Sequence, residues 1–226
     1  MANKRGVNFI PSPFKTVTEY EDEFVTSFNN NLSGAVTEML KYIAKVTASA
    51  VKNTEQLNEV LKEDLKAAEA VVDTNPTQNQ IDAENYKKGH VEIQGFKITI
   101  ENPKGSYRSG TDKAGKQWSV KMKNTYGYFK NSVGNDYDAV DVFIGDNLVS
   151  DKVYVVDQFL DDKFDEHKVM FGFDSKAKAM KAYLSNYQKG WKGLKYITET
   201  TVEEFKEWLQ SNDRKTKPYH DVKVKQ

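Results

Sequence analysis

Three aspartates stand close together in the middle of the chain, immediately before an apolar run. Asp136, Asp138 and Asp141 follow the spacing D-x-D-x-x-D, and the apolar residues 142–144 come next. Carboxylates this close in sequence repel one another, so a cation is expected to compensate their charge. Ligation by oxygen alone favours Mg²⁺ or Mn²⁺, and an EF-hand is disfavoured because its central Gly and closing Glu are missing. The alternative is a solvated acidic turn that binds no ion.

A second acidic group lies downstream, around a predicted hairpin loop. Asp157 ends the apolar run 153–156, and Asp165 and Glu166 precede Lys168. On its own, such a loop is typical of an exposed hairpin tip. If it faces the first group, the carboxylates form a site for two or three metal ions, which would bridge phosphate oxygens and lower the pKa of a bound water. Lys168 would then balance the charge of a phosphate, so the two groups together favour phosphate chemistry.

The elements that must position these residues are short strands followed by helices. The β-like runs are separated by turn signals such as Asn102-Pro103 and lie at 91–93, 96–100, 118–122, 140–144, 153–156 and 169–173. Helical stretches follow at 175–188 and 202–209, and Thr201 with Glu204 resembles a capping box before the second one. This order predicts an α+β fold, a small closed β-barrel of the OB-like type with flanking helices.

The first 80 residues have a different texture. Pro11 and Pro13 lie among apolar residues and indicate an extended arm over residues 1–20. Apolar residues then recur in steps of three and four, which predicts one or two amphipathic helices, broken near Ser33-Gly34: Phe24, Phe28, Leu32, Val36, Leu40, Ile43, Leu57, Leu61, Leu65, Ala68 and Val72. This stripe either packs against the chain's own globular part or binds other chains. Its length, with no strand pattern mixed in, favours self-association or docking on a protein partner.

These changes divide the chain into three predicted parts. Residues 1–80 form the arm and helical extension, which ends in a polar linker at 74–80. Residues 81–211 form the globular domain, and residues 212–226 are a polar, basic tail.

Composition excludes several kinds of site and partner. The chain has no Cys, which rules out disulfides, thiolate metal sites and Cys nucleophiles. Its three His are far apart in sequence, so a His-rich metal site is not expected. Lys+Arg and Asp+Glu both number 33, and this balance gives no overall case for nucleic acid as a partner. No apolar run reaches the roughly 18 residues of a membrane span, and the basic N-terminus lacks the apolar region of a secretion signal. A cytoplasmic protein that is neither secreted nor in a membrane is expected.

Eight segments of the globular domain carry a family resemblance: YKKGHV (86–91), IENPKGSYRSGTD (100–112), YGY (126–128), NDYDAVDVFIG (135–145), VVDQ (155–158), FDEHKVMFGF (164–173), NYQKGWKG (186–193) and ITETTVEEFKEWL (197–209). With these segments, residues 86–209 resemble the family I (soluble) inorganic pyrophosphatases. They resemble more closely the divergent pyrophosphatase-like domain of bacteriophages and other mobile elements. The aspartate triplet after YGY, followed by Asp157 and by Glu166-x-Lys168, is the specific part of the match.

The resemblance implies a five-stranded barrel with flanking helices and Mg²⁺-dependent hydrolysis of pyrophosphate to two phosphates. Asp136 and Asp141 match metal ligands, and Asp138 matches the carboxylate that orients and activates the attacking water. Asp157 and Glu166 match ligands of additional metals, with Glu166 standing where the family usually has Asp. The residues that match phosphate-contacting positions, or the acidic residue that ends the IENP strand, are Glu101, Arg108, Lys121, Tyr126, Lys168, Tyr187 and Lys189.

The sequence also departs from the family pattern. The stretch between Glu101 and Tyr126 is shorter than in the ordinary enzymes, so Arg108 and Lys121 match its basic ligands only approximately. Gln188 stands where the family has a basic residue beside Tyr187, and Lys189 is the nearest substitute. These departures affect substrate affinity and turnover more than metal binding.

Two functions are consistent with these patterns. The first is Mg²⁺-dependent hydrolysis of pyrophosphate, or of a related phosphoanhydride, by a phage-type protein in the host cytoplasm or the phage particle. In that protein, residues 1–80 would dock on a protein partner or self-associate. The alternative is a virion or assembly component in which the pyrophosphatase-like domain is a structural module with weak or no activity. A nucleic-acid-binding barrel is disfavoured, because its basic surface would have to coexist with the acidic groups.

Overall fold

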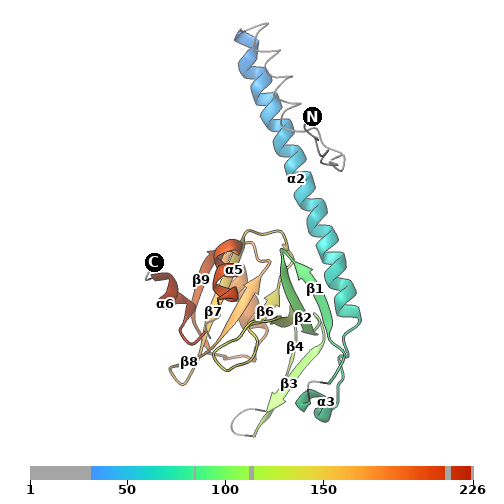
Figure 1. The fold of residues 1–226 in the computed structure, drawn as a ribbon, viewed down its shortest axis with the longest axis vertical. Helices are drawn as coiled ribbons and strands as arrows, with labels where there is room; N and C mark the ends of the chain where they lie inside the picture. Colours follow the sequence, from blue (N-terminus) through green and yellow to red (C-terminus); the bar gives the residue numbers. More distant parts are fainter. Residues whose placement is uncertain (1–31, 84, 112–114, 212–214, 225–226) are drawn as a thin grey trace, which may run out of the picture. The chain divides into compact units, whose positions relative to one another are not determined.

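The structure, a computed structural model, describes residues 32–83, 85–111, 115–211 and 215–224. The expected arm over residues 1–20 and the apolar Phe24 and Phe28 lie outside these ranges. The chain divides into two compact units, Met1–Leu57 and Asn58–Gln226. Figure 1 shows the order of the elements along the chain. None of the described helices combines the length and the apolarity that a membrane-spanning segment requires.

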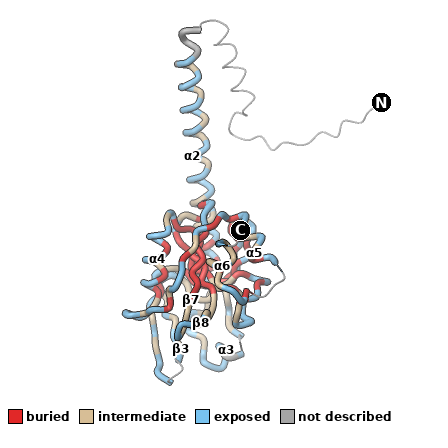
Figure 2. The backbone as a smooth tube through the Cα atoms, turned by 90° about the vertical axis from the view of Figure 1, so that its left-hand side faces the viewer, coloured by how far each residue is buried: buried red, intermediate tan, exposed pale blue. Residues whose placement is uncertain are grey.

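The first described element is a long helix, α2 (Leu32–Ala70). It is continuous through Ser33-Gly34, so the break expected there is absent from the described helix. Figure 2 shows the tube of α2 within the first unit in the colours of exposed and intermediate residues. The exposed large apolar side chains on α2 in this unit are Val36, Met39, Leu40, Ile43, Val51 and Leu57. The predicted apolar stripe is therefore present, and its first half leaves these side chains accessible.

The last turns of α2 belong to the second unit and pack against its sheet. Leu65 and Ala68 are buried in the core, and Leu61 packs against the same cluster. A Cβ atom on Gly89 would lie 2.0 Å from the carbonyl oxygen of Ala68, so only a glycine lets the helix approach the sheet this closely. The second half of the stripe is thus covered by the chain's own domain, which was the alternative interpretation of the pattern.

One mixed sheet of seven strands forms the centre of the second unit. Its order is β1-β2-β5-β6-β8-β7-β9, and only the β6–β8 pair is parallel. The strands are β1 (Gly89–Ile93), β2 (Phe96–Asn102), β5 (Thr125–Phe129), β6 (Asp141–Ile144), β7 (Lys152–Leu160), β8 (Lys163–Phe171) and β9 (Leu194–Thr201). A separate two-stranded ribbon pairs β3 (Tyr107–Thr111) with β4 (Gln117–Lys121).

The sheet is open rather than closed into a barrel. In the described part of the chain, β1 and β9 form its two edges and do not pair with each other. The α+β class is confirmed, but the closed barrel expected from the sequence is not found. Period-2 alternation identifies strands and their faces, but it carries no information on which edges pair.

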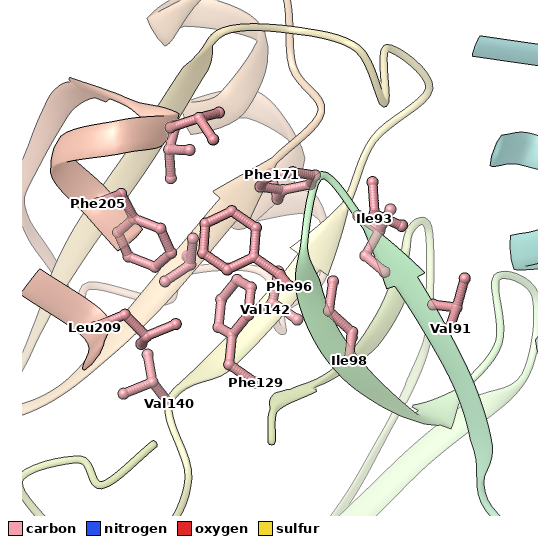
Figure 3. Close-up of a cluster of buried hydrophobic side chains, with 14 of the residues drawn as sticks. Val91, Ile93, Phe96, Ile98, Phe129, Val140, Val142, Phe171, Phe205 and Leu209 are labelled. Atoms are coloured by element: carbon pink, nitrogen blue, oxygen red, sulfur yellow. The ribbon is translucent and has the colours of Figure 1, made fainter. Parts of the chain in front are cut away.

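Helices cover both faces of this sheet, and alternating strand residues build two separate cores. On one face, called here the α5 face, the end of α2 and α5 (Val202–Gln210) cover a cluster that includes Val142, Val155 and Phe171. Figure 3 shows Phe205 of α5 beside Phe96 and Phe129 in this cluster. On the other face, called the α4 face, α4 (Lys176–Ser185) covers a cluster that includes Phe143, Val156 and Met170.

Short caps and turns complete the second unit. The predicted capping box is confirmed, since the Thr201 hydroxyl accepts the Glu204 N–H and the Glu204 carboxylate accepts the Thr201 N–H. The remaining helices are α3 (Gln78–Asp82), which follows a second capping box, and α6 (Tyr219–Val224). Gly127, the glycine of the YGY segment, lets β5 lie close to β2, because a Cβ at this position would lie 1.9 Å from the Thr99 carbonyl oxygen.

Candidate functional site

A pocket of about 370 Å³ opens on the α4 face, around the buried Lys168. We call it the Lys168 pocket; residues of the β3–β4 ribbon, of the β7–β8 hairpin and of the segment after α4 line it, including Arg108, Gln158, Glu166, Lys168, Tyr187 and Trp191. Because side chains alternate along a strand, Glu166, Lys168 and Met170 share one face of β8. The same alternation brings Asp141 and Phe143 of the adjacent β6 to that face.

Lys168 is the centre of an ionic cluster. Its side chain is almost fully buried, and its ammonium group contacts the carboxylate of Asp141 and lies 2.7 Å from Glu166 Oε2. It also donates to the Tyr126 hydroxyl at 3.2 Å. Burial alone would lower the pKa of Lys168, but Asp141, Tyr126 and Glu166 together raise it well above its ordinary value. Lys168 is therefore a permanent buried cation shared by two carboxylates.

Tyr126 and Arg108 extend this cluster towards the β3–β4 ribbon. The Tyr126 hydroxyl donates to Asp141 Oδ2 at 2.6 Å and accepts a hydrogen bond from Arg108 at 3.2 Å. The Arg108 guanidinium lies 4.5 Å from the centre of the Tyr126 ring and 5.5 Å from that of Trp118. Burial raises the pKa of Tyr126, and the charge of Asp141 raises it further, so the phenol stays protonated.

The opposite wall of the pocket is built around Gln158. Its amide nitrogen donates to Asp165 Oδ2 at 2.9 Å and to Glu166 Oε1 at 2.8 Å. Its carbonyl oxygen accepts from the hydroxyls of Tyr183 at 2.7 Å and Tyr187 at 2.9 Å. The Tyr187 ring stacks on the Trp191 ring, with centroids 4.5 Å apart. Burial raises the pKa of Glu166; Lys168 opposes this and Asp141 adds to it.

The pocket thus combines the buried Lys168 and the half-buried Arg108 with tyrosine hydroxyls and carboxylates, which is the set of groups that phosphate chemistry uses. The family comparison bears on the same residues. Residues 78–210, more than half of the chain, match the family model for inorganic pyrophosphatase. The chain belongs to the inorganic pyrophosphatase family.

One solved structure shows a weak similarity to the chain. A crystal structure of an inorganic phosphatase from Anaplasma phagocytophilum is 14% identical to the chain, with a TM-score of 0.29. The aligned part covers 62% of this chain and 96% of that protein. No curated protein sequence matches the chain.

Within the pyrophosphatase-family domain, Asp157 lies away from the pocket. It is fully buried on the α5 face, where its carboxylate accepts the N–H groups of Tyr219 at 2.6 Å and His220 at 3.0 Å. His167 Nε2 lies 3.4 Å from the same carboxylate. Asp157, expected to be a metal ligand together with Asp136, Asp141 and Glu166, is therefore not part of the pocket, and Gln158 occupies the position that faces Glu166.

A β-bulge explains this difference. Next to the hairpin turn at Asp161 and Asp162, Leu160 pairs with Lys163 and Phe159 with Phe164. If this register continued along the hairpin, Asp157 would lie opposite Glu166. The register shifts between Gln158 and Phe159, and Asp165 becomes an extra residue on β8, so that Gln158 pairs with Glu166 and Asp157 with His167. A shift of one residue moves side chains to the other face of the sheet, and such a bulge has no clear sequence signal.

Asp136 and Asp138 lie on the loop between β5 and β6 and are exposed. The Asp136 carboxylate accepts the Asp138 N–H at 3.2 Å, and the neighbouring Asn135 amide donates to the Asp165 carbonyl at 2.7 Å. This last bond ties the loop to the acidic end of β8. Neither aspartate lines the Lys168 pocket, although their loop is attached to one of its walls.

The other expected phosphate-contacting residues are more dispersed. Glu101 lies in a neighbouring hollow of about 490 Å³, where it pairs with Lys88 at 2.7 Å and accepts from the Tyr86 hydroxyl at 3.2 Å. Arg108 lines both hollows. Lys121 and Lys189 are exposed, and neither lines the Lys168 pocket. The structure thus brings together Arg108, Tyr126, Asp141, Glu166, Lys168 and Tyr187.

Inorganic pyrophosphatases generally use a divalent metal, typically Mg²⁺. Among the described residues, no three His, Asp or Glu side chains are grouped closely enough to hold one. Asp141 and Glu166 nevertheless share one cationic partner, the Lys168 ammonium, so a positive charge is stabilised between them. Mg²⁺ commonly binds through one or two carboxylates together with substrate phosphates. Asp141 and Glu166 would be the ligands of such an ion, but only after the Lys168 ammonium leaves the space between their carboxylates.

Proposed function

We propose that the pyrophosphatase-family domain binds inorganic pyrophosphate, or a related phosphoanhydride, in the Lys168 pocket and hydrolyses it with Mg²⁺ or Mn²⁺. The observation that carries this proposal is the cluster of the buried Lys168 and Tyr126 with Arg108, beside Asp141 and Glu166. Lys168 and Arg108 offset the charges of Asp141 and Glu166, so a bound divalent ion would supply the net positive charge that attracts a polyanion, and a low local dielectric would strengthen that attraction.

Hydrolysis forms a bond between a water oxygen and one phosphorus and breaks the bridging P–O bond. The water proton must reach a base, and the negative charge on the leaving phosphate must be stabilised. We assign the second task to Lys168 and Arg108, which can neutralise phosphate oxygens, and to the hydroxyls of Tyr126 and Tyr187, which can orient them. A bound divalent ion would neutralise further charge and acidify a water molecule.

Asp138 is our candidate for the base. This role comes from the family resemblance, and the loop that carries Asp138 is tied to the acidic end of β8 through Asn135. An ionised carboxylate accepts a proton, whereas the buried cation Lys168 cannot. Asp136, on the same loop, would assist metal binding.

The test is phosphate release from pyrophosphate by the full chain, with Mg²⁺ and with EDTA. Lys168→Met keeps the length of the side chain but removes its charge, and we expect hydrolysis to fall about 100- to 1,000-fold, as when one preorganised charge-stabilising group is removed. The matched control is Lys130→Met, at an exposed position outside the pocket. Equal rates for both variants, or no release by the parent with Mg²⁺, would refute the proposed activity.

The exposed half of α2 favours a second candidate function, an assembly role. Val36 is 61%, Leu40 59% and Ile43 49% exposed, and leaving such side chains in water is costly, because burial of each is worth about 1.5–3 kcal/mol. We propose that the helical extension within residues 1–80 self-associates or docks on a protein partner, for example a component of a phage particle. In the alternative that we keep open, the domain serves such an assembly with weak or no activity.

Light scattering on the full chain tests the assembly role. Leu40→Lys with Ile43→Lys should shift the protein towards the monomer. Glu55→Lys adds the same two units of charge at an exposed polar position of the helix and should not. Because Leu61 and Leu65 belong to the core of the second unit, a truncation should end at Leu57 and not at residue 80. A parent that is already monomeric would exclude self-association.

A further inference from the structure

The Lys168 pocket has an apolar end beside its ionic end. Trp118 and Val120 of the β3–β4 ribbon, Leu160 of β7 and Trp191 after α4 line it together, and all four are half-buried. Inorganic pyrophosphate is polar on every side and would leave this apolar wall in contact with water. An apolar wall beside a few polar groups is typical of a pocket for an organic ligand.

The β3–β4 ribbon turns one of its faces towards the pocket. Its residues alternate between exposed and half-buried, and Arg108, Trp118 and Val120 of the half-buried face line the pocket. Across the two strands, Arg108 pairs with Val120 and Gly110 with Trp118. A Cβ on Gly110 would lie 2.6 Å from the Trp118 ring, so the indole lies across a position that only a glycine leaves open. The ribbon therefore places an indole and a guanidinium side by side at the pocket.

The two tryptophans of the pocket differ in what covers their rings. Trp191 is held by the chain itself, since its ring stacks on Tyr187 and its Nε1 donates to the Tyr183 hydroxyl at 2.9 Å. In the described part of the chain, Trp118 packs on no other aromatic ring, and the Arg108 guanidinium lies 5.5 Å from its ring centre. Trp118 is therefore the aromatic surface that the pocket offers to a ligand.

We propose that the Lys168 pocket takes a phosphoanhydride that carries an aromatic base, in the chemical class of the nucleoside diphosphates. The base stacks on Trp118, and the phosphates lie at the ionic end, beside Arg108 and Lys168. Every base has a π-face, so stacking on one ring does not choose between bases. This inference deepens the proposed function and rests on it, because it takes the ionic end of the pocket as the phosphate site.

The experiment compares two ligands that differ by the nucleoside, α,β-methylene-ADP and methylenediphosphonate, by calorimetry on the full chain with Mg²⁺. Their P–C–P bridge resists hydrolysis, and each brings Mg²⁺ on its own phosphonate oxygens, so no metal site of the protein is presupposed. The parent should bind the nucleotide analogue more tightly than methylenediphosphonate. Trp118→Ala should weaken the nucleotide analogue about 5- to 150-fold, as when one base loses its aromatic partner, and should leave the affinity for methylenediphosphonate unchanged.

Two further variants serve as controls. Tyr107→Ala removes an aromatic ring from the exposed face of the same ribbon, outside the Lys168 pocket, and should change neither affinity. Trp118→Phe keeps an aromatic ring at the proposed position and should retain most of the affinity for the nucleotide analogue. Thermal unfolding of each variant confirms that it is folded.

Equal weakening of both ligands by Trp118→Ala would overturn the inference, as would a parent that binds methylenediphosphonate at least as tightly as the nucleotide analogue. The comparison in the parent decides even if Trp118→Ala does not fold. Because the measurement involves no turnover, a failure of the proposed hydrolysis would show separately, as absent phosphate release from pyrophosphate while the nucleotide analogue still binds through Trp118. A parent that binds neither ligand would refute both.

Discussion

Two faces of one hairpin, β7–β8, hold neighbouring acidic residues in opposite situations. On the α4 face, Glu166 bonds to Lys168 and Gln158 and opens onto a pocket. On the α5 face, the buried Asp157 carboxylate accepts the backbone N–H groups of Tyr219 and His220 and lies 3.4 Å from His167 Nε2. The chemistry open to an acidic residue in a family motif therefore depends on the face of the strand on which it lies.

Ionisation differs between the two faces in the same way. On the α4 face, Lys168 keeps its charge because carboxylates surround it. On the α5 face, burial raises the pKa of Asp157 to about 6, although two backbone N–H groups oppose it, and burial lowers the pKa of His167 to about 3. The α4 face thus keeps Lys168 charged, whereas the α5 face favours the neutral forms of Asp157 and His167.

The largest expected effect is on phosphate release, and it tests whether the chemistry takes place at the α4 face. Asp138→Asn should reduce phosphate release about 100- to 10,000-fold, because Asn cannot accept the proton of the attacking water, and should largely spare Mg²⁺ affinity. The control is Asp162→Asn at the exposed hairpin tip, which should behave like the parent. Equal activity of both variants would remove Asp138 from the mechanism.

A second prediction concerns stability on the α5 face. The folded state favours protonated Asp157, so this group contributes stability that is lost as pH rises from about 4 to about 6. Asp157→Asn removes this loss, while His167 contributes to both proteins. The stability of the variant relative to the parent should therefore increase by about 2–3 kcal/mol between pH 4 and pH 7.

Urea unfolding at several pH values measures this difference. A stability difference that stays constant with pH would mean that Asp157 ionises normally, and the contrast between the two faces would then fail.

The smallest expected effect is on metal affinity. Asp141→Asn should weaken Mg²⁺ binding about tenfold or more, as expected when one charged ligand is lost. Asp157→Asn should leave it unchanged, since Asp157 does not face the pocket. Calorimetric titration measures the Mg²⁺ affinity of both variants. If the two substitutions weaken it equally, Asp157 would be a metal ligand after all.

Much of the site could be predicted from the sequence. The spacing of Asp141 and Lys168 relative to the apolar runs, together with the family segments, identified residues that the structure brings into contact. Six of the nine described strands and the helices α4 and α5 were also predicted, because alternation and capping are local signals, whereas β3, β5 and β9 were not. The α+β class follows from them.

The remainder depends on pairing, which is not local. The bulge at Asp165 exchanged the positions of Asp157 and Gln158 relative to Glu166, and no residue type in the hairpin announces it. The prediction of a closed barrel was wrong for the same reason. The alternating pattern does not encode whether the edge strands β1 and β9 pair with each other. Gln158 was not predicted, because an amide carries no charge and its four hydrogen-bond partners lie elsewhere in the chain.

The continuity of α2 has one more consequence. Helix formation is cooperative, so whatever orders one half of a helix also suppresses fraying in the other. A partner that covers Val36 to Leu57 would therefore slow amide hydrogen exchange at Leu65 and Ala68, which lie under β1 close to Gly89. Hydrogen exchange at these two helix residues would therefore report whether a partner is bound to the first half of α2, without any change in the contacts of the sheet.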